Sequence, residues 1–263
     1  MPNIAVIGSQ DVDLYEWLDD ARPLVVPTRD KEVRGTVGKL HGVEIAFIPR
    51  NGDGVPRPPH VIDYRSNIEA LVSLGCRQVL TTSMAGTVRT AIPLRSLLLL
   101  DQFIDFTRNR QFSYFRDGDP FGFADMTEPF CPSLRESTLA AAEKAGVDIS
   151  PYGCYVCVPG PRFETRAEVR MYGQLGADLI GHTTVTDAVM AREAGLCFVT
   201  VAGVITMGAG LGEHAMNAHE WHESRRSCAQ RFRLIVDQLA HATSIGEVDS
   251  NGCGCRSAAP IER

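Results

Sequence analysis

The feature that most constrains the fold of this chain is an alternation of short apolar runs with segments of helical spacing. Such alternation is typical of a mainly parallel sheet whose two faces are covered by helices. Most of the helical segments end at a glycine, which is a common stop signal. The runs of strand length lie at 3–8, 33–38, 42–49, 77–82, 96–101, 152–158, 178–181 and 196–205, and the helical segments at 64–74, 133–145, 167–175, 187–194 and 220–241.

The organisation of the chain indicates one α/β domain, which we place at residues 1–245. The 263 residues suit a single large α/β domain, and the sequence contains no internal repeat and no linker composition. From residue 246 to residue 263 the chain turns polar, so we expect a disordered tail there.

Charge and hydropathy exclude several classes of function. The formal net charge is -6, whereas nucleic-acid binders usually carry a basic face. The N-terminal residues contain no cationic stretch followed by an apolar run, and no run approaches the ~20 apolar residues of a membrane span. We therefore expect a cytoplasmic protein without nucleic-acid or membrane partners.

Cysteine and histidine spacing does not predict a metal centre. Cys154 and Cys157 lie in a strand-like run whose alternation separates their thiols. Cys253 and Cys255 stand in the polar tail, free to oxidise or to bind metal opportunistically, and the histidines at 214, 219 and 222 suit a solvated face. The remaining cysteines are interpreted as small buried hydrophobes, namely Cys76, Cys131, Cys197 and Cys228.

Ligands of such folds bind over loops at the carboxyl ends of the strands. The loops at those ends read GSQD, RNGDG, TTSMAG, GPRFET, GHTT and ITMGAG. Several longer runs carry a specific likeness, among them DYRSNIEAL at 63–71, TSMAGTVR at 82–89, GPRFETRAE at 160–168 and GADLIGHTTVTDAVMAREAGLCF at 176–198. These runs, in this order, resemble the methylthioadenosine phosphorylases and trimeric purine nucleoside phosphorylases.

The resemblance implies a single domain with a twisted, mixed, mostly parallel sheet flanked by helices, assembled as a homotrimer. It implies a pentosyltransferase that uses inorganic phosphate as co-substrate and needs no cofactor. Phosphate attacks the anomeric carbon of a purine-like nucleoside, and the products are the free base and ribose 1-phosphate. A 5′-modified nucleoside such as methylthioadenosine or methylthioinosine is within this range.

The resemblance also implies which residues hold phosphate. Arg50 matches the phosphate arginine, and its fork suits a bidentate contact. Asn51 stands where the family commonly has histidine and can still donate a hydrogen bond. Ser83 and Thr183 match hydroxyl donors, and Met84 matches a residue that contributes its backbone N–H.

The first loop departs from the glycine-rich family pattern. Either Ser9 or Gln10 takes the hydroxyl role, depending on a one-residue shift in the match. Asp11 adds negative charge close to where the phosphate dianion is expected, which is unfavourable unless the side chain points away.

The sugar and base are expected between two loops and a neighbouring subunit. Phe163 matches the phenylalanine that lies along the purine, and His182 replaces a methionine that packs on the ribose. We hypothesise that His182 hydrogen-bonds a sugar hydroxyl or acts as an acid near neutral pH. Phe123 stands where the partner often contributes a histidine near the 5′ group.

The base loop lacks the aspartates of the adenine-specific members. Where those members carry Thr-Asp-Tyr-Asp, this chain has Thr206 followed by Met207 and Gly208, so no carboxylate is present. We assign Thr206 a catalytic and Gly208 a substrate-binding position, and we expect weak adenine activity, as in branches that prefer 6-oxopurines. Two alternatives remain open, a hydrolase in which water replaces phosphate and a catalytically weak ligand-binding homologue.

Overall fold

A ten-stranded mixed sheet forms the centre of the protein in the computed structural model, which describes residues 2–9, 12, 14–212, 217–248 and 253–255. Along the sheet the strands follow the order β2-β3-β4-β1-β5-β9-β8-β7, and β10 pairs with β5 and with β6. The strands are β1 (Ile4–Gly8), β2 (Asp19–Pro27), β3 (Glu32–Leu40), β4 (Val43–Pro49), β5 (Gln78–Thr87), β6 (Leu97–Leu99), β7 (Gln102–Asp105), β8 (Cys154–Cys157), β9 (Leu179–Gly181) and β10 (Cys197–Met207).

Parallel pairing in the middle of the sheet aligns the carboxyl ends of four strands. Strand β1 pairs in parallel with β4 and β5, and β5 pairs in parallel with β10. The backbone N–H of Arg50 donates to the carbonyl of Gly8 at 2.8 Å, so the loops after β1 and β4 leave the sheet side by side. The loops expected to hold a ligand therefore share one edge.

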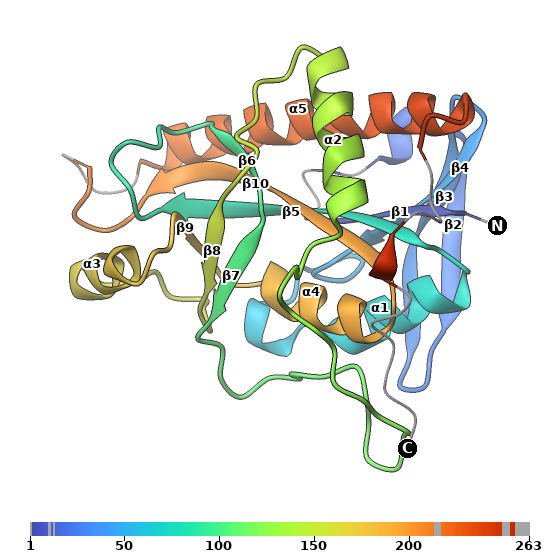
Figure 1. Ribbon diagram of the computed structural model, residues 1–263, viewed down its shortest axis with the longest axis horizontal. Coiled ribbons are helices and arrows are strands. Elements are labelled where there is room, and N and C mark those ends of the chain that lie inside the picture. The colour runs from blue at the N-terminus through green and yellow to red at the C-terminus, as the bar shows by residue number, and fades with distance from the viewer. Residues whose placement is uncertain (1, 10–11, 13, 213–216, 249–252, 256–263) are drawn as a thin grey trace.

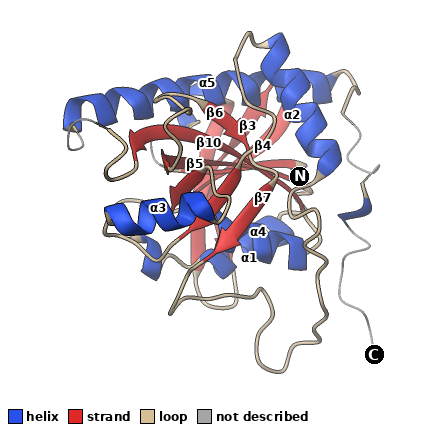
Figure 2. Ribbon diagram, turned by 60° about the vertical axis from the view of Figure 1, so that its left-hand side comes forward, coloured by secondary structure: helices blue, strands red, loops and turns tan. Residues whose placement is uncertain are grey.

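Helices cover both faces of the sheet, as Figures 1 and 2 show. Helices α2 (Pro132–Lys144) and α5 (Ala218–Ser244) pack together on one face, while α1 (Tyr64–Ser73) and α4 (Thr184–Glu193) pack together on the other. Each face has its own core cluster of buried apolar side chains. Helix α3 (Arg166–Gln174) covers a smaller third cluster beside β8 and β9. The two-faced architecture confirms the α/β domain expected from the alternation.

Two edge strands, β2 and β7, escaped the sequence prediction. Strand β2 is mostly exposed and contains two prolines, and β7 is short and has no buried residue. Neither shows the apolar alternation of a half-buried strand, because an edge strand needs little burial to pair on one side. The sheet also contains four antiparallel pairings, β2 with β3, β3 with β4, β5 with β9, and β6 with β10.

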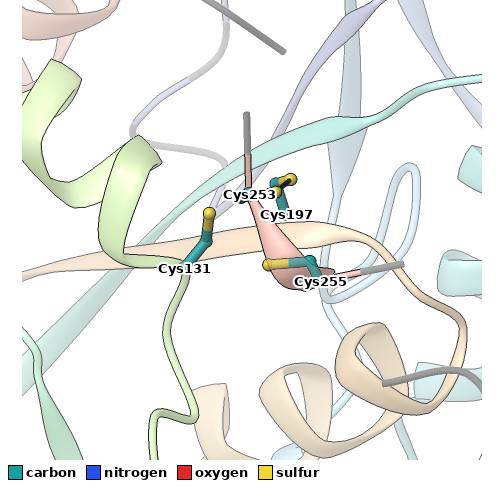
Figure 3. Close-up of side chains that lie close together, drawn as sticks. All are labelled: Cys131, Cys197, Cys253 and Cys255. Carbon is teal, nitrogen blue, oxygen red and sulfur yellow. Dashed lines mark hydrogen bonds between the residues drawn. The ribbon is translucent and has the colours of Figure 1, made fainter. Parts of the chain in front are cut away.

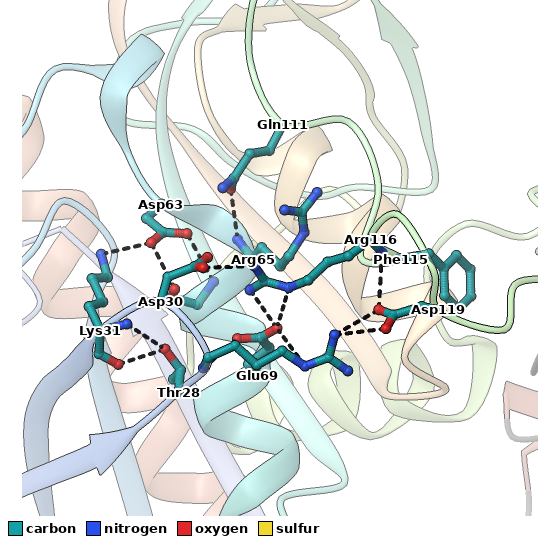
Figure 4. Close-up of polar contacts among 12 residues, drawn as sticks. Thr28, Asp30, Lys31, Asp63, Arg65, Glu69, Gln111, Phe115, Arg116 and Asp119 are labelled. Carbon is teal, nitrogen blue, oxygen red and sulfur yellow. Dashed lines mark hydrogen bonds and ion pairs between the residues drawn. The ribbon is translucent and has the colours of Figure 1, made fainter.

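The long connection, residues 106–131 between β7 and α2, contains no helix or strand and is held by ion pairs (Figure 4). Arg116 donates to the buried carboxylate of Glu69 in α1 at 2.7 Å. Asp119 pairs with Arg29, in the turn between β2 and β3, at 2.8 Å. These contacts fix a segment that carries several exposed aromatic side chains.

The end of the chain departs from the expected disordered tail at the residues that the structure describes. Cys255 is 2% exposed, and Cys253 and Val248 pack against the core cluster beneath α2 and α5. The polar composition of the tail concealed this contact, because the few apolar side chains that make it are isolated in the sequence. Among the described helices none is long and apolar enough to span a membrane.

Candidate active site

Arg50 is the centre of a buried polar cluster at the carboxyl edge of the sheet. Its side chain is 3% exposed, and Nη1 donates to the carbonyl oxygen of Thr82 at 2.8 Å. Nη2 contacts the hydroxyl of Thr81, and Nε donates to Oδ2 of Asp187 at 2.5 Å. Thr82 precedes Ser83, and Asp187 lies in the first turn of α4, whose N-cap is Thr183. Arg50 thus contacts β5 directly before Ser83, and it contacts the first turn of the helix that Thr183 caps.

The ion pair between Arg50 and Asp187 is fully enclosed. Burial raises the pKa of Asp187, while the Arg50 guanidinium opposes that rise. The three bonds that Arg50 makes use three of the five N–H groups of a guanidinium. Asp187 therefore orients the arginine, and these three bonds leave two guanidinium N–H donors unused. The sequence analysis did not single out Asp187, because an acid in a first helical turn is an ordinary feature.

Tyr155 connects Ser83 to the start of α4. The hydroxyl of Ser83 lies 3.0 Å from the hydroxyl of the fully buried Tyr155. Burial raises the pKa of Tyr155, and the opposing contributions include Ser83 and the backbone of Thr183. A side chain at Gly181 would collide with the Tyr155 hydroxyl, so this glycine is required for close approach. Ser83 and Thr183 are held in a common network with a tyrosine that stays protonated.

The structure also places the other residues expected to hold phosphate. The side-chain amide of Asn51 donates to the carbonyl of Arg57 at 2.8 Å, so it closes its own loop, contrary to the expected phosphate contact. The carbonyl of Ser9 accepts from Val12 at 3.0 Å, and Met84 packs partly buried against the core. Gln10, the alternative to Ser9, lies outside the described residues.

The GPRFET loop and the start of α4 are clamped together by Arg110. Its guanidinium donates to the carbonyl of Pro159 and to the carbonyl of His182, each at 2.7 Å. A side chain at Gly160 would meet the His182 ring at 2.8 Å, so the loop backbone lies directly on the imidazole. The sequence analysis missed Arg110, since an arginine in a loop gives no signal of this bridging role.

His182 and Glu164 form a half-enclosed pair at the base side of the site. His182 Nε2 lies 3.9 Å from Glu164 Oε1, and the exposed fractions of the two side chains are 19% and 8%. Burial lowers the pKa of His182 and raises that of Glu164. Neither Glu164 Oε1 nor His182 Nδ1 has a hydrogen-bond partner among the described residues. The lowered pKa disfavours the hypothesis that His182 acts as an acid at neutral pH.

Glu164 was not among the predicted site residues, although one signal for it existed. It directly follows Phe163 in the GPRFET loop, so a carboxylate stands beside the side chain expected to lie along the purine. Burial of a carboxylate oxygen without a hydrogen-bond donor costs free energy, which indicates that a bound molecule supplies the donor. A cavity of about 260 Å³ opens beside Glu164 and Gly160, and its described lining does not include Arg50, Ser83 or Thr183.

Both predicted aromatic contacts are exposed in the single chain. Phe163 is 53% exposed, and Phe123 is 80% exposed with its ring edge-on to Phe121. Phe163 lies beside Glu164, as the loop sequence requires, whereas Phe123 belongs to the long connection. Both rings are accessible to a ligand or to another copy of the chain.

Thr206 and Gly208 lie at the end of β10, but the structure gives them packing roles. The hydroxyl of Thr206 donates to the carbonyl of Met207 at 3.2 Å. The N–H of Gly208 donates to the carbonyl of Thr87 at 2.8 Å, and a side chain there would meet that carbonyl at 2.7 Å. Gly208 is therefore needed for close packing, and its backbone donor is already used. This differs from the predicted substrate contact at Gly208.

Comparison with known proteins places the whole domain in one family. A family model described as the phosphorylase superfamily matches residues 4–241. This chain belongs to the phosphorylase superfamily. The 6-oxopurine nucleoside phosphorylase of Pyrococcus furiosus is 36% identical over 266 aligned residues, which cover 98% of each chain. The S-methyl-5′-thioadenosine phosphorylase of Thermofilum pendens is 40% identical over 238 residues, which cover 90% of each chain.

Solved structures of other phosphorylases share the fold. A methylthioadenosine phosphorylase sourced from an antarctic soil metagenomic library is 29% identical and superposes with a TM-score of 0.90, covering 99% of this chain and 92% of its own. The family resemblance and the nucleoside phosphorylase fold expected from the loops are therefore confirmed. Among the curated relatives of this phosphorylase, names for 6-oxopurine nucleosides and for methylthioadenosine both occur.

Proposed function

We propose that this phosphorylase cleaves a 6-oxopurine nucleoside with inorganic phosphate, giving the free base and ribose 1-phosphate. The observation that carries the proposal is the meeting of Arg50, Ser83 and Thr183 at one corner of the sheet. The comparisons support the reaction class, since the relatives named above are phosphorylases of purine nucleosides. A charged arginine, a hydroxyl and a helix N-terminus suit a phosphate dianion.

The proposed mechanism assigns phosphate to this corner. Arg50 and the N-terminus of α4 hold the dianion, and the serine and threonine hydroxyls orient it beneath the anomeric carbon. A phosphate oxygen forms a bond to that carbon while the bond from the carbon to the base nitrogen breaks. The electron pair of the broken bond leaves with the base, which takes up a proton. While the two bonds change, the phosphate charge stabilises the oxocarbenium-like sugar.

Glu164 supports the preference for a 6-oxopurine. Such a base carries a hydrogen on N1, whereas N1 of adenine is only an acceptor, so a carboxylate at this edge favours the oxo form. Glu164 lies next to Phe163 and has a buried oxygen without a hydrogen-bond partner among the described residues. In the base loop, Met207 follows Thr206 where the adenine-specific members have an aspartate, so an acceptor for the amino group of adenine is absent from this position. Both features disfavour adenine nucleosides.

The proposed assembly is a homotrimer in which the long connection of one chain reaches the site of its neighbour. Phe112 and Phe123 are 81% and 80% exposed, and Phe121 is 55% exposed. Clustered exposed aromatic side chains are typical of interaction surfaces. In this arrangement Phe123 lies beside the 5′ position and favours an apolar 5′ substituent, such as the methylthio group, over a hydroxyl.

The test is a panel of nucleosides incubated with the purified protein in the presence and absence of phosphate. We expect inosine, guanosine and methylthioinosine to give ribose 1-phosphate products only when phosphate is added, and methylthioadenosine to react slowly. Free ribose formed without phosphate would identify a hydrolase and overturn the proposal. No release of base from any nucleoside would identify a binding protein.

A further inference from the structure

Four cysteine side chains that are far apart in the sequence gather at one point of the fold (Figure 3). They are Cys131, Cys197, Cys253 and Cys255, and their four sulfur atoms all lie within 4.8 Å of one another. The sulfurs of Cys197 and Cys253 lie 2.9 Å apart. The other four cysteines, Cys76, Cys154, Cys157 and Cys228, are not part of the group.

The core of the domain positions two of the sulfurs. Cys131 is the N-cap residue of α2, and its backbone N–H donates to the carbonyl of Phe198 at 2.9 Å. Cys197 is the first residue of β10, and its N–H donates to the carbonyl of Arg77 at 2.9 Å. Both backbones are therefore held by hydrogen bonds within the domain, which do not involve the tail. The N-terminal end of α2 also favours a negatively charged ligand atom such as a thiolate.

The tail supplies the other two sulfurs from residues that are separated only by Gly254. Cys255 is 2% exposed, as is Cys131, and Cys197 is 6% exposed. Ordinary burial of cysteines as small hydrophobes explains thiols that are scattered through a core. It does not explain why four of them converge, two of them from a tail whose neighbouring residues are polar.

Their spacing matches a tetrahedral metal site. With zinc–sulfur bonds of about 2.3 Å, the sulfurs of a tetrahedral site are about 3.8 Å apart. The separations in this cluster are all within 4.8 Å, and one of them is 2.9 Å, so small shifts of the side chains would bring the sulfurs to that spacing. Disulfide bonds would use the sulfurs in pairs and would not require all four to be mutual neighbours. Oxygen ligands do not contribute to the group, and a set of four thiols selects zinc or iron.

We propose that Cys131, Cys197, Cys253 and Cys255 bind one zinc ion. As it binds, the four thiols lose their protons to solvent, and four sulfur–zinc bonds form without any change of oxidation state. Four protein ligands complete the coordination shell, so the ion has no open position for catalysis. The cluster lies at the amino ends of β5 and β10, opposite the edge that holds Arg50 and Ser83. The proposed role is to fasten the tail across the start of β10 and α2.

The experiment measures metal content and mass on the full chain. The protein is purified under reducing, chelator-free conditions, supplied with zinc and then desalted, and we expect one zinc per chain by elemental analysis. Cobalt in place of zinc is expected to give the intense visible bands of a tetrahedral thiolate site. Cys253→Ser with Cys255→Ser is expected to abolish zinc binding, while Cys154→Ser with Cys76→Ser, the control pair outside the cluster, keeps it.

The possible outcomes distinguish zinc binding from disulfide formation, and they do not depend on the phosphorylase reaction. Intact mass under non-reducing conditions that shows two hydrogens fewer for each cysteine pair would identify disulfides and overturn the proposal. Fully reduced thiols without bound metal after reconstitution would also overturn it, and one iron per chain would overturn the choice of zinc. Because zinc binding is measured directly, a failed phosphorylase assay does not affect the result. The tail variant is expected to keep phosphorylase activity at low temperature.

Discussion

The phosphate half and the base half of the candidate site differ in how their polar groups are partnered. Arg50 is enclosed and held by three bonds to the protein, and Ser83 shares its hydroxyl with Tyr155. In the base half, one oxygen of Glu164 and one nitrogen of His182 have no hydrogen-bond partner among the described residues, and that oxygen lies 3.9 Å from the other nitrogen of His182. Phe163, beside them, is half-exposed.

In the proposed site, this difference corresponds to two tasks. Binding of phosphate is the same for every substrate, whereas recognition of the base depends on the substrate. Phosphate is the same for every nucleoside, so its ligands are prearranged by the sheet and by buried partners such as Asp187. The base differs between substrates, and the residues proposed to contact it, such as Glu164, lie in loops and have polar atoms without hydrogen-bond partners among the described residues. Changes in the phosphate half should therefore affect all substrates and the stability together, whereas changes in the base half should alter the ratio between substrates.

Substituting Arg50→Met gives the largest expected effect. It removes the cation that holds phosphate, and we expect kcat/KM to fall about 10³-fold for every nucleoside. It also leaves Asp187 buried without its partner, which costs about 3–5 kcal/mol of unfolding free energy. Steady-state kinetics with varied phosphate and thermal unfolding measure the two losses.

The double variant Arg50→Met with Asp187→Leu is the matched control. It replaces the whole ion pair by apolar side chains, so stability should largely return while activity does not. Recovery of activity together with stability would show that Arg50 acts only in folding, and the phosphate half would lose its proposed role.

Substituting Glu164→Gln is expected to change selectivity and leave stability intact. An amide replaces a charged acceptor of N1–H, so kcat/KM for inosine should fall about 10–100-fold, which is the range for losing one charge-assisted hydrogen bond. The amide can also donate to N1 of adenine, so the ratio of inosine to adenosine turnover should fall further. Glu164→Leu should lose inosine activity without gaining adenosine activity. An unchanged ratio in both variants would remove Glu164 from the base half.

The sequence was sufficient for the parts of the fold that burial controls. Both faces of the sheet, the five helices and the strands of the middle carry apolar patterns that only one architecture satisfies. Strands β2 and β7 were missed, because edge strands pair on one side and lack a buried pattern. The position of Cys255 was missed, because the contact joins a polar tail to residues 131 and 197, and nothing local in the tail reveals this partner.

Within the site, sequence reasoning found loops more reliably than individual partners. Arg50 follows β4, Ser83 lies within β5 and Thr183 is the N-cap of α4, and the phosphate role that the resemblance implies for them stays a prediction. Asp187 and Arg110 were not foreseen, since each acts through a contact with a distant loop or strand. Asn51 and Gly208 were assigned to ligands but use their donors within the protein. Long-range hydrogen bonds are set by packing and leave no local signature.

The pH dependence of stability gives a smaller effect in the base half. Burial lowers the folded-state pKa of His182 below its ordinary value of 6.5. As pH falls, His182 is protonated in the unfolded chain before it is protonated in the folded chain. The folded protein therefore has its full stability above about pH 6.5, and it loses part of this stability as pH falls through the folded-state pKa. His182→Met should become more stable than the unmodified protein as pH falls from about 8 to about 5. Parallel melting curves across this range would contradict a buried neutral histidine.

The smallest expected effect is that of Phe123→Ala, which extends the comparison to a neighbouring chain. Phe123 is 80% exposed in the single chain, so its loss should not lower the melting temperature of a monomer. In the proposed trimer it contacts the 5′ substituent, so KM for methylthioinosine should rise about 3–10-fold while KM for inosine stays nearly constant, as expected for one lost apolar contact. Phe112→Ala, with a similarly exposed ring on the same connection, is the control and should leave both KM values unchanged. Equal changes of KM for both nucleosides would show that Phe123 supports assembly and does not contact the 5′ group. The mass of the complex in analytical ultracentrifugation would then show directly whether the trimer is lost.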